Sequence, residues 1–330
     1  MSIEIIVKAN NLSKHYMIKK GIWSFLGGGK GFTIKAVDQI NFEIMRGEIF
    51  GLAGESGSGK TTTGRMLALL EKPTYGSIIF EGTDLASLKG KELKHFRRKV
   101  QMIFQDPYES LDPRLKIYDS IYEALAIHSI GSSKQERTKI IKETLENVGL
   151  SPPEEFLNRY PHELSGGQRQ RASIARAIVL KPKFIIADEP VSMIDTSVCA
   201  GILNLMMKLR STMNVTYIFI THDLAIARYI CDRLAIMYQG KIRELGHTED
   251  VINKPLHPYT KILLSSVPIP DPGFKRQRIR IPGEWDIFYN QMGCKFHGRC
   301  PNANEKCTKE EPELREILPE HWVACHLYAF

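Results

Sequence analysis

The stretch GESGSGKT, residues 54–61, places three glycines, a lysine and a threonine hydroxyl within eight positions. An apolar segment at 48–53 precedes it and suits a buried strand, and a helical apolar spacing follows it. Glycines adopt backbone angles that are closed to other residues, so the N–H groups of such a turn can close around a phosphate. The N-terminus of the following helix adds unpaired N–H donors and a favourable dipole. This segment therefore predicts a nucleoside triphosphate site.

Two side chains of this phosphate loop have defined roles in the predicted site. Lys60 can reach the β and γ phosphates, and the hydroxyl of Thr61 can bind Mg²⁺. The alternative is an ordinary glycine-rich turn before a helix, which the complete pattern in this context makes the weaker interpretation. The residues expected to contact the nucleotide here are Gly54, Glu55, Ser56, Gly57, Ser58, Gly59, Lys60, Thr61 and Thr62.

Two adjacent acids end the apolar segment KFIIADEP, residues 183–190. At the end of a parallel strand, Asp188 and Glu189 would lie near the phosphate loop. Asp188 can hold Mg²⁺, directly or through water, and Glu189 is then placed to polarise the water that attacks the γ-phosphate. An apolar strand that ends in two acids is common by itself, and it becomes informative together with the phosphate loop.

A serine and a glycine pair stand in ELSGGQRQR, residues 163–171, again before a helical pattern. Ser165, Gly166 and Gly167 suit a second grip on phosphate, and we assign Gln168 to the same nucleotide site. Together with the phosphate loop and the acidic pair, this segment resembles the nucleotide-binding subunit of ATP-binding cassette (ABC) transporters, whose signature motif is LSGGQ.

Other motifs of that family follow in the expected order. MIFQDP supplies Gln105 of the Q-loop, SMID supplies Asp195 of the D-loop, and FITHD supplies the switch histidine His222. In LSKHY, Tyr16 matches the aromatic residue that stacks on adenine, and Phe32 is the alternative for that role. The resemblance covers nearly the whole chain and depends on at least six motifs.

The resemblance implies a mechanism in which two cassettes face each other head to tail. Each ATP then lies between the phosphate loop of one cassette and the signature motif of the other, so Ser165 would complete the partner's site. Glu189 would be the general base, and His222 would stabilise the γ-phosphate and hold Glu189 and the attacking water in register. Lys60 and Mg²⁺ would supply positive charge, and Gln105 would sense the γ-phosphate and Mg²⁺.

Apolar segments alternate with helical stretches, which predicts an α/β sheet with substantial parallel character. With the resemblance, the expected fold is a P-loop NTPase ABC cassette: a RecA-like core, an antiparallel β subdomain and a helical subdomain at about 106–164. We expect the cassette over residues 1–252. Recurring prolines after that point predict a linker into a small C-terminal extension, residues 253–330.

Four of the six cysteines lie near the C-terminus, at Cys294, Cys300, Cys307 and Cys325. In a reducing compartment such crowding favours metal over disulfides. Four thiolates suit either Zn²⁺ or an iron–sulfur cluster, and the absence of a Cys-x-x-Cys pair favours iron–sulfur. We predict a metal-stapled extension that holds a [4Fe–4S] cluster, with Zn²⁺ as the alternative and free thiols as the third interpretation.

The segment HPYTKILLSSVPIPDP, residues 257–272, and the later GCKFHGRCP resemble the oligopeptide and dipeptide permease branch of ABC transporters, whose ATPase subunits can carry such a cluster. This implies an ATPase that powers import of di- or oligopeptides; import of oligosaccharides or nickel is the alternative. The expected partners are a second ATPase subunit, two transmembrane permease subunits and, indirectly, an extracellular or periplasmic substrate-binding protein. The ATPase pair would be a heterodimer, or a homodimer in isolation, at the cytoplasmic face of the membrane.

Composition and charge bear on the rival functions. The chain is 43% hydrophobic and 25% charged, typical of a globular protein, and its net charge is +8. A positive charge could suit nucleic acid, but the basic residues are spread along the chain, so we expect no nucleic-acid partner. A soluble ABC ATPase acting on DNA or ribosomes usually carries a coiled-coil insert or two cassettes, and this sequence has neither. A redox protein driven by ATP is the third hypothesis.

Overall fold

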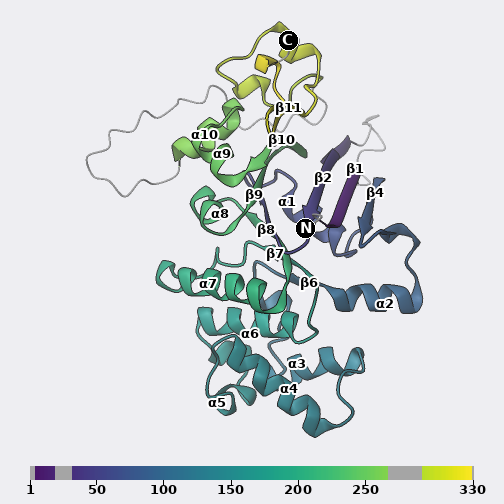
Figure 1. Ribbon diagram of the computed structural model, residues 1–330, viewed down its shortest axis with the longest axis vertical. Helices are drawn as coiled ribbons and strands as arrows, with labels where there is room; N and C mark the ends of the chain where they lie inside the picture. Colours follow the sequence, from purple (N-terminus) through teal and green to yellow (C-terminus); the bar gives the residue numbers. More distant parts are fainter. Residues whose placement is uncertain (1–3, 19–31, 267–291, 329–330) are drawn as a thin grey trace, which may run out of the picture. The chain divides into compact units, whose positions relative to one another are not determined.

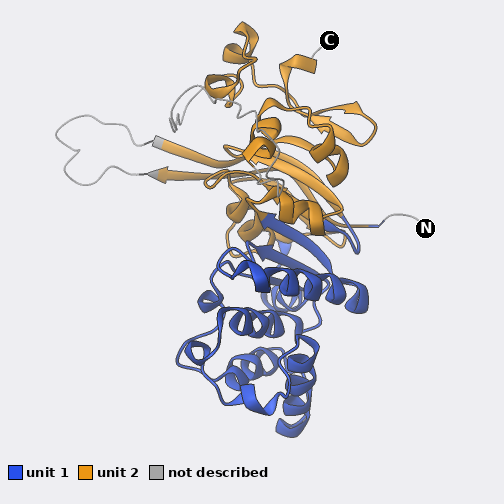
Figure 2. Ribbon diagram, turned by 90° about the vertical axis from the view of Figure 1, so that its left-hand side faces the viewer, with its two compact units in different colours: residues 1–4, 45–49, 87–220 blue, residues 5–44, 50–86, 221–330 orange. Residues whose placement is uncertain are grey.

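The computed structural model describes residues 4–18, 32–266 and 292–328. The chain divides into two compact units, coloured separately in Figure 2. Unit 1 comprises residues 1–4, 45–49 and 87–220, and unit 2 comprises residues 5–44, 50–86 and 221–330. The side chain of Phe32, the alternative partner of adenine, lies outside the described part of the chain. The domain bounds predicted above, 1–252 and 253–330, stay predictions.

Unit 1 contains three parallel strands in the order β8-β7-β6. They are β6 (Val100–Ile103), β7 (Phe184–Asp188) and β8 (Thr216–Thr221). Every residue of β7 and β8 is buried, as expected for parallel strands that are covered on both faces. The apolar segments at 183–187 and 215–220 therefore form the strands that the sequence predicted.

Helices make up most of the rest of unit 1, and α3, α4 and α6 pack against one another (Figure 1). Apolar residues spaced four apart line the buried faces, such as Ile121 and Leu125 on α3 and Ile141 and Leu145 on α4. The helices are α2 (Gly90–Lys99), α3 (Ile117–Ile127), α4 (Lys134–Asn147), α5 (Glu154–Leu157), α6 (Gly166–Ile178) and α7 (Thr196–Met213), with short 3₁₀ turns at Pro107–Glu109 and Pro161–Glu163.

Unit 2 contains a four-stranded sheet in the order β2-β1-β4-β5. Its strands are β1 (Ile5–Ile18), β2 (Phe32–Met45), β4 (Tyr75–Phe80) and β5 (Thr83–Asp84). The β1–β4 and β4–β5 pairs are antiparallel. This sheet corresponds to the antiparallel β subdomain that the sequence predicted.

A second group of strands in unit 2 has the order β11-β12-β10-β9-β3. The strands are β3 (Ile49–Ala53), β9 (Arg233–Tyr238), β10 (Lys241–His247), β11 (Arg315–Leu318) and β12 (His321–Val323). Only the β3–β9 pair among these described strands is parallel. The helices of this unit are α1 (Lys60–Leu67), α8 (Leu224–Ile230), α9 (Thr248–Asn253), α10 (Pro258–Ser266) and α11 (Glu305–Lys309), with 3₁₀ turns at Leu85–Ser87, His297–Arg299 and His326–Tyr328.

The C-terminal residues 292–328 continue the fold of unit 2. The β11–β12 hairpin extends the sheet, because β12 pairs with β10 through Glu244↔Val323 and Leu245↔Trp322. Phe296 is 1% exposed, and its ring centroid lies 5.2 Å from that of Tyr238 and 5.4 Å from that of Tyr259. Strand pairing and an aromatic cluster thus fasten this extension to the unit.

Buried polar groups join the same region. The carboxylate of Glu244, which is fully buried, accepts bonds from the backbone N–H groups of Leu256, at 2.8 Å, and His257, at 2.9 Å. Its Oε1 also lies 2.7 Å from Nε2 of the buried His321. A buried carboxylate is stable only when hydrogen-bond donors surround it. Because Glu244 on β10 finds its donors in the segment at 256–257 and at His321 on β12, this network fixes how the extension pairs with the sheet.

The metal-stapled form of the extension is not supported. Among residues 4–18, 32–266 and 292–328, no group of three or more Cys, His, Asp or Glu side chains is arranged to hold a metal ion. A small appendage needs a staple when it has little core of its own. This one instead shares the sheet and the aromatic cluster of unit 2, which the cysteine spacing could not reveal.

No helix in the described part of the chain is both long enough and apolar enough to span a bilayer.

Candidate nucleotide site

The phosphate loop lies between β3 and α1, and its backbone requires glycine at two positions. Gly54 has a φ of 155° and Gly59 a φ of 104°. A Cβ on Gly54 would lie 2.1 Å from the carbonyl oxygen of Met237, and one on Gly59 would lie 2.2 Å from that of Ala36. Both neighbours are backbone atoms that cannot move away from a side chain. Glycine at these two positions therefore lets the loop pack closely against the backbone at Met237 and Ala36.

Lys60 is the first residue of α1 and is 5% exposed. Its ammonium group donates to the carbonyl oxygens of Gly54, at 2.8 Å, and Glu55, at 2.9 Å. The lysine therefore lies inside the curve of the loop, where phosphate oxygens would replace these carbonyls as acceptors. The remaining predicted contacts divide by exposure: Ser56 and Gly57 are exposed, Ser58 is buried, and Thr61 and Thr62 are half-buried in the first turn of α1.

Tyr16, the predicted adenine contact, belongs to β1 in the same unit and is 36% exposed. Its hydroxyl donates a short hydrogen bond to the carboxylate of Glu71. Burial and this bond raise the pKa of Tyr16 to about 12. The ammonium of Lys14 lies 5.2 Å from the centroid of the ring. The tyrosine is thus held in one orientation with part of its ring accessible to a ligand.

His222 follows β8 directly, and its side chain is exposed. The next residue, Asp223, caps α8: its Oδ1 accepts from the N–H groups of Ala225, at 2.7 Å, and Ile226, at 3.3 Å. A capped helix start fixes the chain immediately after the histidine. The backbone therefore positions His222 at the boundary between a strand and a helix.

In unit 1 the structure brings Gln105 and Glu189 together. The amide Nε2 of Gln105 donates to Oε2 of Glu189 at 3.2 Å. Asp188, the last residue of β7, is 4% exposed. The Q-loop amide and the two acids thus lie at the end of a buried parallel strand, the place where α/β sheets bind ligands.

Glu189 has an unusual backbone conformation, with a φ of 45°. This left-handed region is uncommon for a residue with a side chain and is costly unless the surroundings impose it. The N–H of Glu189 donates to the carbonyl oxygen of Ile220 at 3.0 Å, and its own carbonyl accepts from the hydroxyl of Ser192 at 3.0 Å. These bonds hold the chain in a sharp turn immediately after the strand.

The signature motif begins α6, and Ser165 is the N-cap of this helix. The hydroxyl of Ser165 accepts from the N–H of Gln168 at 3.3 Å, while Oε1 of Gln168 accepts from the N–H of Ser165 at 3.1 Å. This reciprocal capping box explains why these two residues stand three positions apart. Ser165 and Gly166 are exposed. Gly167 is buried, and a Cβ at this position would lie 2.5 Å from the side chain of Val198.

Asp195 of the D-loop is exposed at the N-cap of α7, and its side chain accepts no capping bond there. Met193, two residues earlier, is 62% exposed. The D-loop therefore presents an acid and a large apolar side chain on the surface of unit 1, which is suitable for contact with another protein.

Contacts to Glu55 were not predicted from the sequence. Arg299, in the 3₁₀ turn between Cys294 and Cys300, forms two parallel hydrogen bonds with the carboxylate of Glu55, at 2.9 and 3.1 Å. The hydroxyl of Tyr259 accepts from the N–H of Glu55 at 2.9 Å. No local signal could have indicated these pairs, because they join positions 244 and 204 residues apart.

The four C-terminal cysteines form no disulfide and differ in their degree of burial. Cys294 and Cys307 are buried, and the N–H of Cys294 donates to the carbonyl oxygen of Cys307 at 2.8 Å. Burial raises the pKa of Cys294 and Cys300, and it raises that of Cys325 to about 11. The pKa of Cys325 is raised further by Cys294, Cys300 and Cys307, which are therefore its neighbours.

Comparison with known families matches two parts of the chain. Residues 37–192 match the family model described as "ABC transporter". Residues 243–307 match the model described as "Oligopeptide/dipeptide transporter, C-terminal region". The second match begins in β10 and runs through the aromatic cluster to Cys307.

Related proteins align over almost the whole chain. YkfD of Bacillus subtilis is 50% identical over 91% of this chain and 92% of its own length. The "Oligopeptide transport ATP-binding protein AppF" of the same organism is 45% identical over 99% of this chain and 98% of its own. The "Oligopeptide transport ATP-binding protein OppF" of Bacillus subtilis is 44% identical over 98% of this chain and 96% of its own length.

Solved structures resemble the cassette. The dimeric cassette MJ0796 bound to ADP and phosphate has a TM-score of 0.63 and 29% identity, covering 74% of this chain and 99% of that one. The cbiO1 subunit of Clostridium perfringens, part of an ABC transporter complex, has a TM-score of 0.63 and 25% identity, covering 76% and 92%. The chain belongs to the ATP-binding ATPase subunits of ABC transporters, in the oligopeptide and dipeptide transporter branch.

Proposed function

We propose that this chain binds and hydrolyses ATP to power an importer of di- or oligopeptides. The observation that carries the proposal is the pair of family matches on one chain, a cassette followed by the C-terminal region of oligopeptide and dipeptide transporters. Relatives named for oligopeptide transport cover nearly its full length. The alternative cargoes, oligosaccharides and nickel, remain outcomes of the experiment below.

Binding of ATP is assigned to the phosphate loop of unit 2. Its N–H groups and Lys60 would neutralise the β and γ phosphates, and Tyr16 would stack on adenine. The hydroxyl of Thr61, the carboxylate of Asp188 and the amide of Gln105, each assigned to Mg²⁺ from the sequence, would supply the oxygen ligands that Mg²⁺ prefers. When bound, Mg²⁺ would balance the charge of the phosphates during transfer.

Hydrolysis is assigned to Glu189, which would accept a proton from the attacking water. The bond from Gln105 and the fixed turn of its backbone support this role, because both limit the directions in which its carboxylate can point. His222 would contact the γ-phosphate and the water. Ser165, exposed at the N-cap of α6, would donate to the ATP of a partner cassette, and Asp195 would lie in the same interface.

Pairing is supported by the related cassette MJ0796, which was solved as a dimer. The second ATPase subunit would be a related chain in the cell, with a homodimer as the form in isolation. Attachment to two permease subunits would place the protein at the cytoplasmic face of a membrane. A substrate-binding protein on the other side of the membrane would deliver the peptide without touching this chain.

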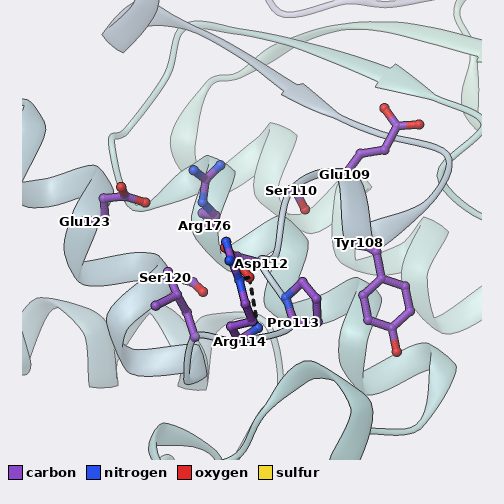
Figure 3. A pocket seen from close by; sticks show the side chains of 10 residues that line it. Tyr108, Glu109, Ser110, Asp112, Pro113, Arg114, Ser120, Glu123 and Arg176 are labelled. Atoms are coloured by element: carbon purple, nitrogen blue, oxygen red, sulfur yellow. Dashed lines mark hydrogen bonds and ion pairs between the residues drawn. The ribbon is translucent and has the colours of Figure 1, made fainter.

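A cavity in unit 1 supports a docking site for a permease subunit. Its volume is about 510 Å³, and it lies among the 108–115 segment, α3 and α6 (Figure 3). Charged side chains line it, including Glu109, Glu123 and Arg176. The hydroxyl of Ser120, also in the lining, is buried and has no hydrogen-bond partner within the described residues. A polar loop or helix end of a permease would pair with the charged side chains of this lining and connect the cassette to the membrane.

The C-terminal cysteines are proposed to hold a [4Fe–4S] cluster, and one observation besides their proximity fits an anionic group. Arg243 is fully buried beside Cys294, and its Nε and Nη2 make no hydrogen bond within the described part of the chain. When bound, the cluster would supply a rigid, negatively charged cross-link.

Purification without oxygen tests the cluster. We expect absorbance at about 400 nm, where cysteine-ligated iron–sulfur centres absorb. We also expect about four irons and four sulfides per chain. Cys300→Ser should remove most of the iron, whereas Cys199→Ser, outside the extension, should keep it. A colourless protein that contains zinc would favour the alternative metal, and one with neither metal would leave free thiols.

Transport in cells tests the main proposal. Cells without this gene would be complemented with the wild type, Lys60→Ala or Lys309→Ala, and uptake of a labelled oligopeptide, an oligosaccharide and Ni²⁺ would be measured. Wild type and Lys309→Ala, which alters an exposed side chain on α11, should restore peptide uptake, and Lys60→Ala should not. Restoration of oligosaccharide or nickel uptake alone would replace the peptide assignment.

A further inference from the structure

Glu55 is the second residue of the phosphate loop, and all its polar groups are occupied within unit 2. Its carbonyl oxygen accepts from Lys60 at 2.9 Å. Its N–H donates to the hydroxyl of Tyr259 on α10 at 2.9 Å. Its carboxylate accepts two bonds from Arg299 at 2.9 and 3.1 Å. One residue of the loop therefore joins the phosphate-binding lysine to two residues of the C-terminal region.

Arg299 is itself held firmly. Arg299 is 9% exposed, and its guanidinium carbon lies 5.7 Å from the ring centroid of Tyr238 and 5.9 Å from that of Phe296. One of its nitrogens also donates to the hydroxyl of Tyr238 at 3.2 Å. A guanidinium that makes two parallel hydrogen bonds to a carboxylate is held in a defined orientation.

The turn that carries Arg299 has a second anchor. The ammonium of Lys295 donates to the carbonyl oxygen of Gln239 at 2.9 Å and to the carboxylate of Asp38 at 3.3 Å. Gln239 precedes Gly240, whose N–H donates to the carbonyl oxygen of Ser58 in the phosphate loop at 2.8 Å. Residues 292–328 thus reach the loop directly through Arg299 and indirectly through Lys295 and the β9–β10 turn.

We propose that Arg299 is a positioning residue of the nucleotide site, through which the C-terminal extension sets the affinity for ATP. The arginine contacts no phosphate. By fixing the carboxylate of Glu55, it keeps the carbonyl of the same residue in place as the resting acceptor of Lys60, and it restricts the backbone of the phosphate loop. Without it, the loop would have to be ordered by ATP itself, which reduces the apparent affinity.

Steady-state ATP hydrolysis with MgATP by the purified full-length chain and its complex tests the proposal, which depends on the nucleotide site proposed above. Arg299→Leu should raise KM for ATP about tenfold, within the usual range of coupling between sites, and leave kcat within about twofold. Arg299→Lys keeps the charge but cannot make two parallel bonds, so its KM should be intermediate. Arg315→Leu is the matched control, because it removes an exposed ion pair with Glu313 in the same extension.

A double-mutant cycle separates positioning from general loss of structure. In a Glu55→Gln background, Arg299→Leu should raise KM no further, because the contact is already weakened. An equal rise in both backgrounds, or an unchanged KM in Arg299→Leu and Arg299→Lys, would overturn the proposal. If Arg299→Leu does not fold, the Arg299→Lys cycle gives the same decision. Either result leaves peptide uptake by the wild type, and with it the proposed function, intact.

Discussion

At the residue scale, Glu189 combines two properties that suit a general base. Its carboxylate is held by the amide of Gln105 at 3.2 Å, and its φ of 45° places the chain in a tight turn after β7. Strained backbone of this kind persists where surrounding bonds impose it, here the bond to Ile220. The direction of the carboxylate therefore depends on strand geometry as well as on the side chain.

A second residue, His257, has a protonation state that is fixed by its surroundings. It is 1% exposed, and its Nδ1 accepts from the N–H of Tyr259 at 3.0 Å. Burial, assisted by the positive charges of Arg243 and Lys261, holds its pKa well below the ordinary value of 6.5. The neutral ring belongs to the same aromatic cluster as Phe296, with ring centroids 5.7 Å apart.

This histidine predicts a loss of stability in acid. Because its pKa is lower in the folded chain, the unfolded chain binds the proton first as the pH falls below about 6.5, so stability decreases from that point downward. His257→Asn keeps an acceptor for the N–H of Tyr259 but does not titrate. Between pH 6.5 and 5.5, the wild type should lose roughly 1 kcal/mol more unfolding free energy than this variant, measured with denaturant. Equal losses would show that His257 is not the group responsible.

At the scale of elements, the extension is held by packing that can be tested directly. Phe296 fills the space between Tyr238, Tyr259 and His257. Phe296→Ala should lower the free energy of unfolding by about 3–5 kcal/mol, the usual cost of a large cavity in a core. Leu327→Ala, at a 47% exposed leucine of the same extension, should change it by less than about 0.5 kcal/mol. Similar effects of the two variants in denaturant unfolding would argue against the aromatic cluster as the anchor.

The elements also show which parts of the site a sequence can reveal. The phosphate loop, the acidic end of β7 and the capping box of Ser165 and Gln168 are local, since each depends on residues a few positions apart. The pairing of the β11–β12 hairpin with β10 and the ion pair of Arg299 and Glu55 join residues far apart in the sequence. Such contacts leave no pattern of residue spacing from which they could be predicted. For the same reason, the cysteine spacing predicted a metal site but not the strand pairing that joins the extension to β10.

At the scale of the whole molecule, the assignment combines a cassette with an extension that is specific to one transporter branch. The signature serine and the D-loop acid are exposed on unit 1, as expected if a second cassette completes each site. The extension contacts the phosphate loop within unit 2 through Arg299. Nucleotide binding is therefore expected to depend on the C-terminal region.

We expect this chain to hydrolyse ATP through Glu189 within a pair of cassettes. The most direct measurement uses complexes purified through a tag on this chain, as wild type, Glu189→Gln and Glu143→Gln, the last at an exposed acid on α4. With MgATP, we expect Glu189→Gln to keep ATP binding, to lose at least about 100-fold in turnover and to accumulate as an ATP-bound dimer, while Glu143→Gln should behave as the wild type. Turnover near the wild-type rate in Glu189→Gln would show that Glu189 is not the general base.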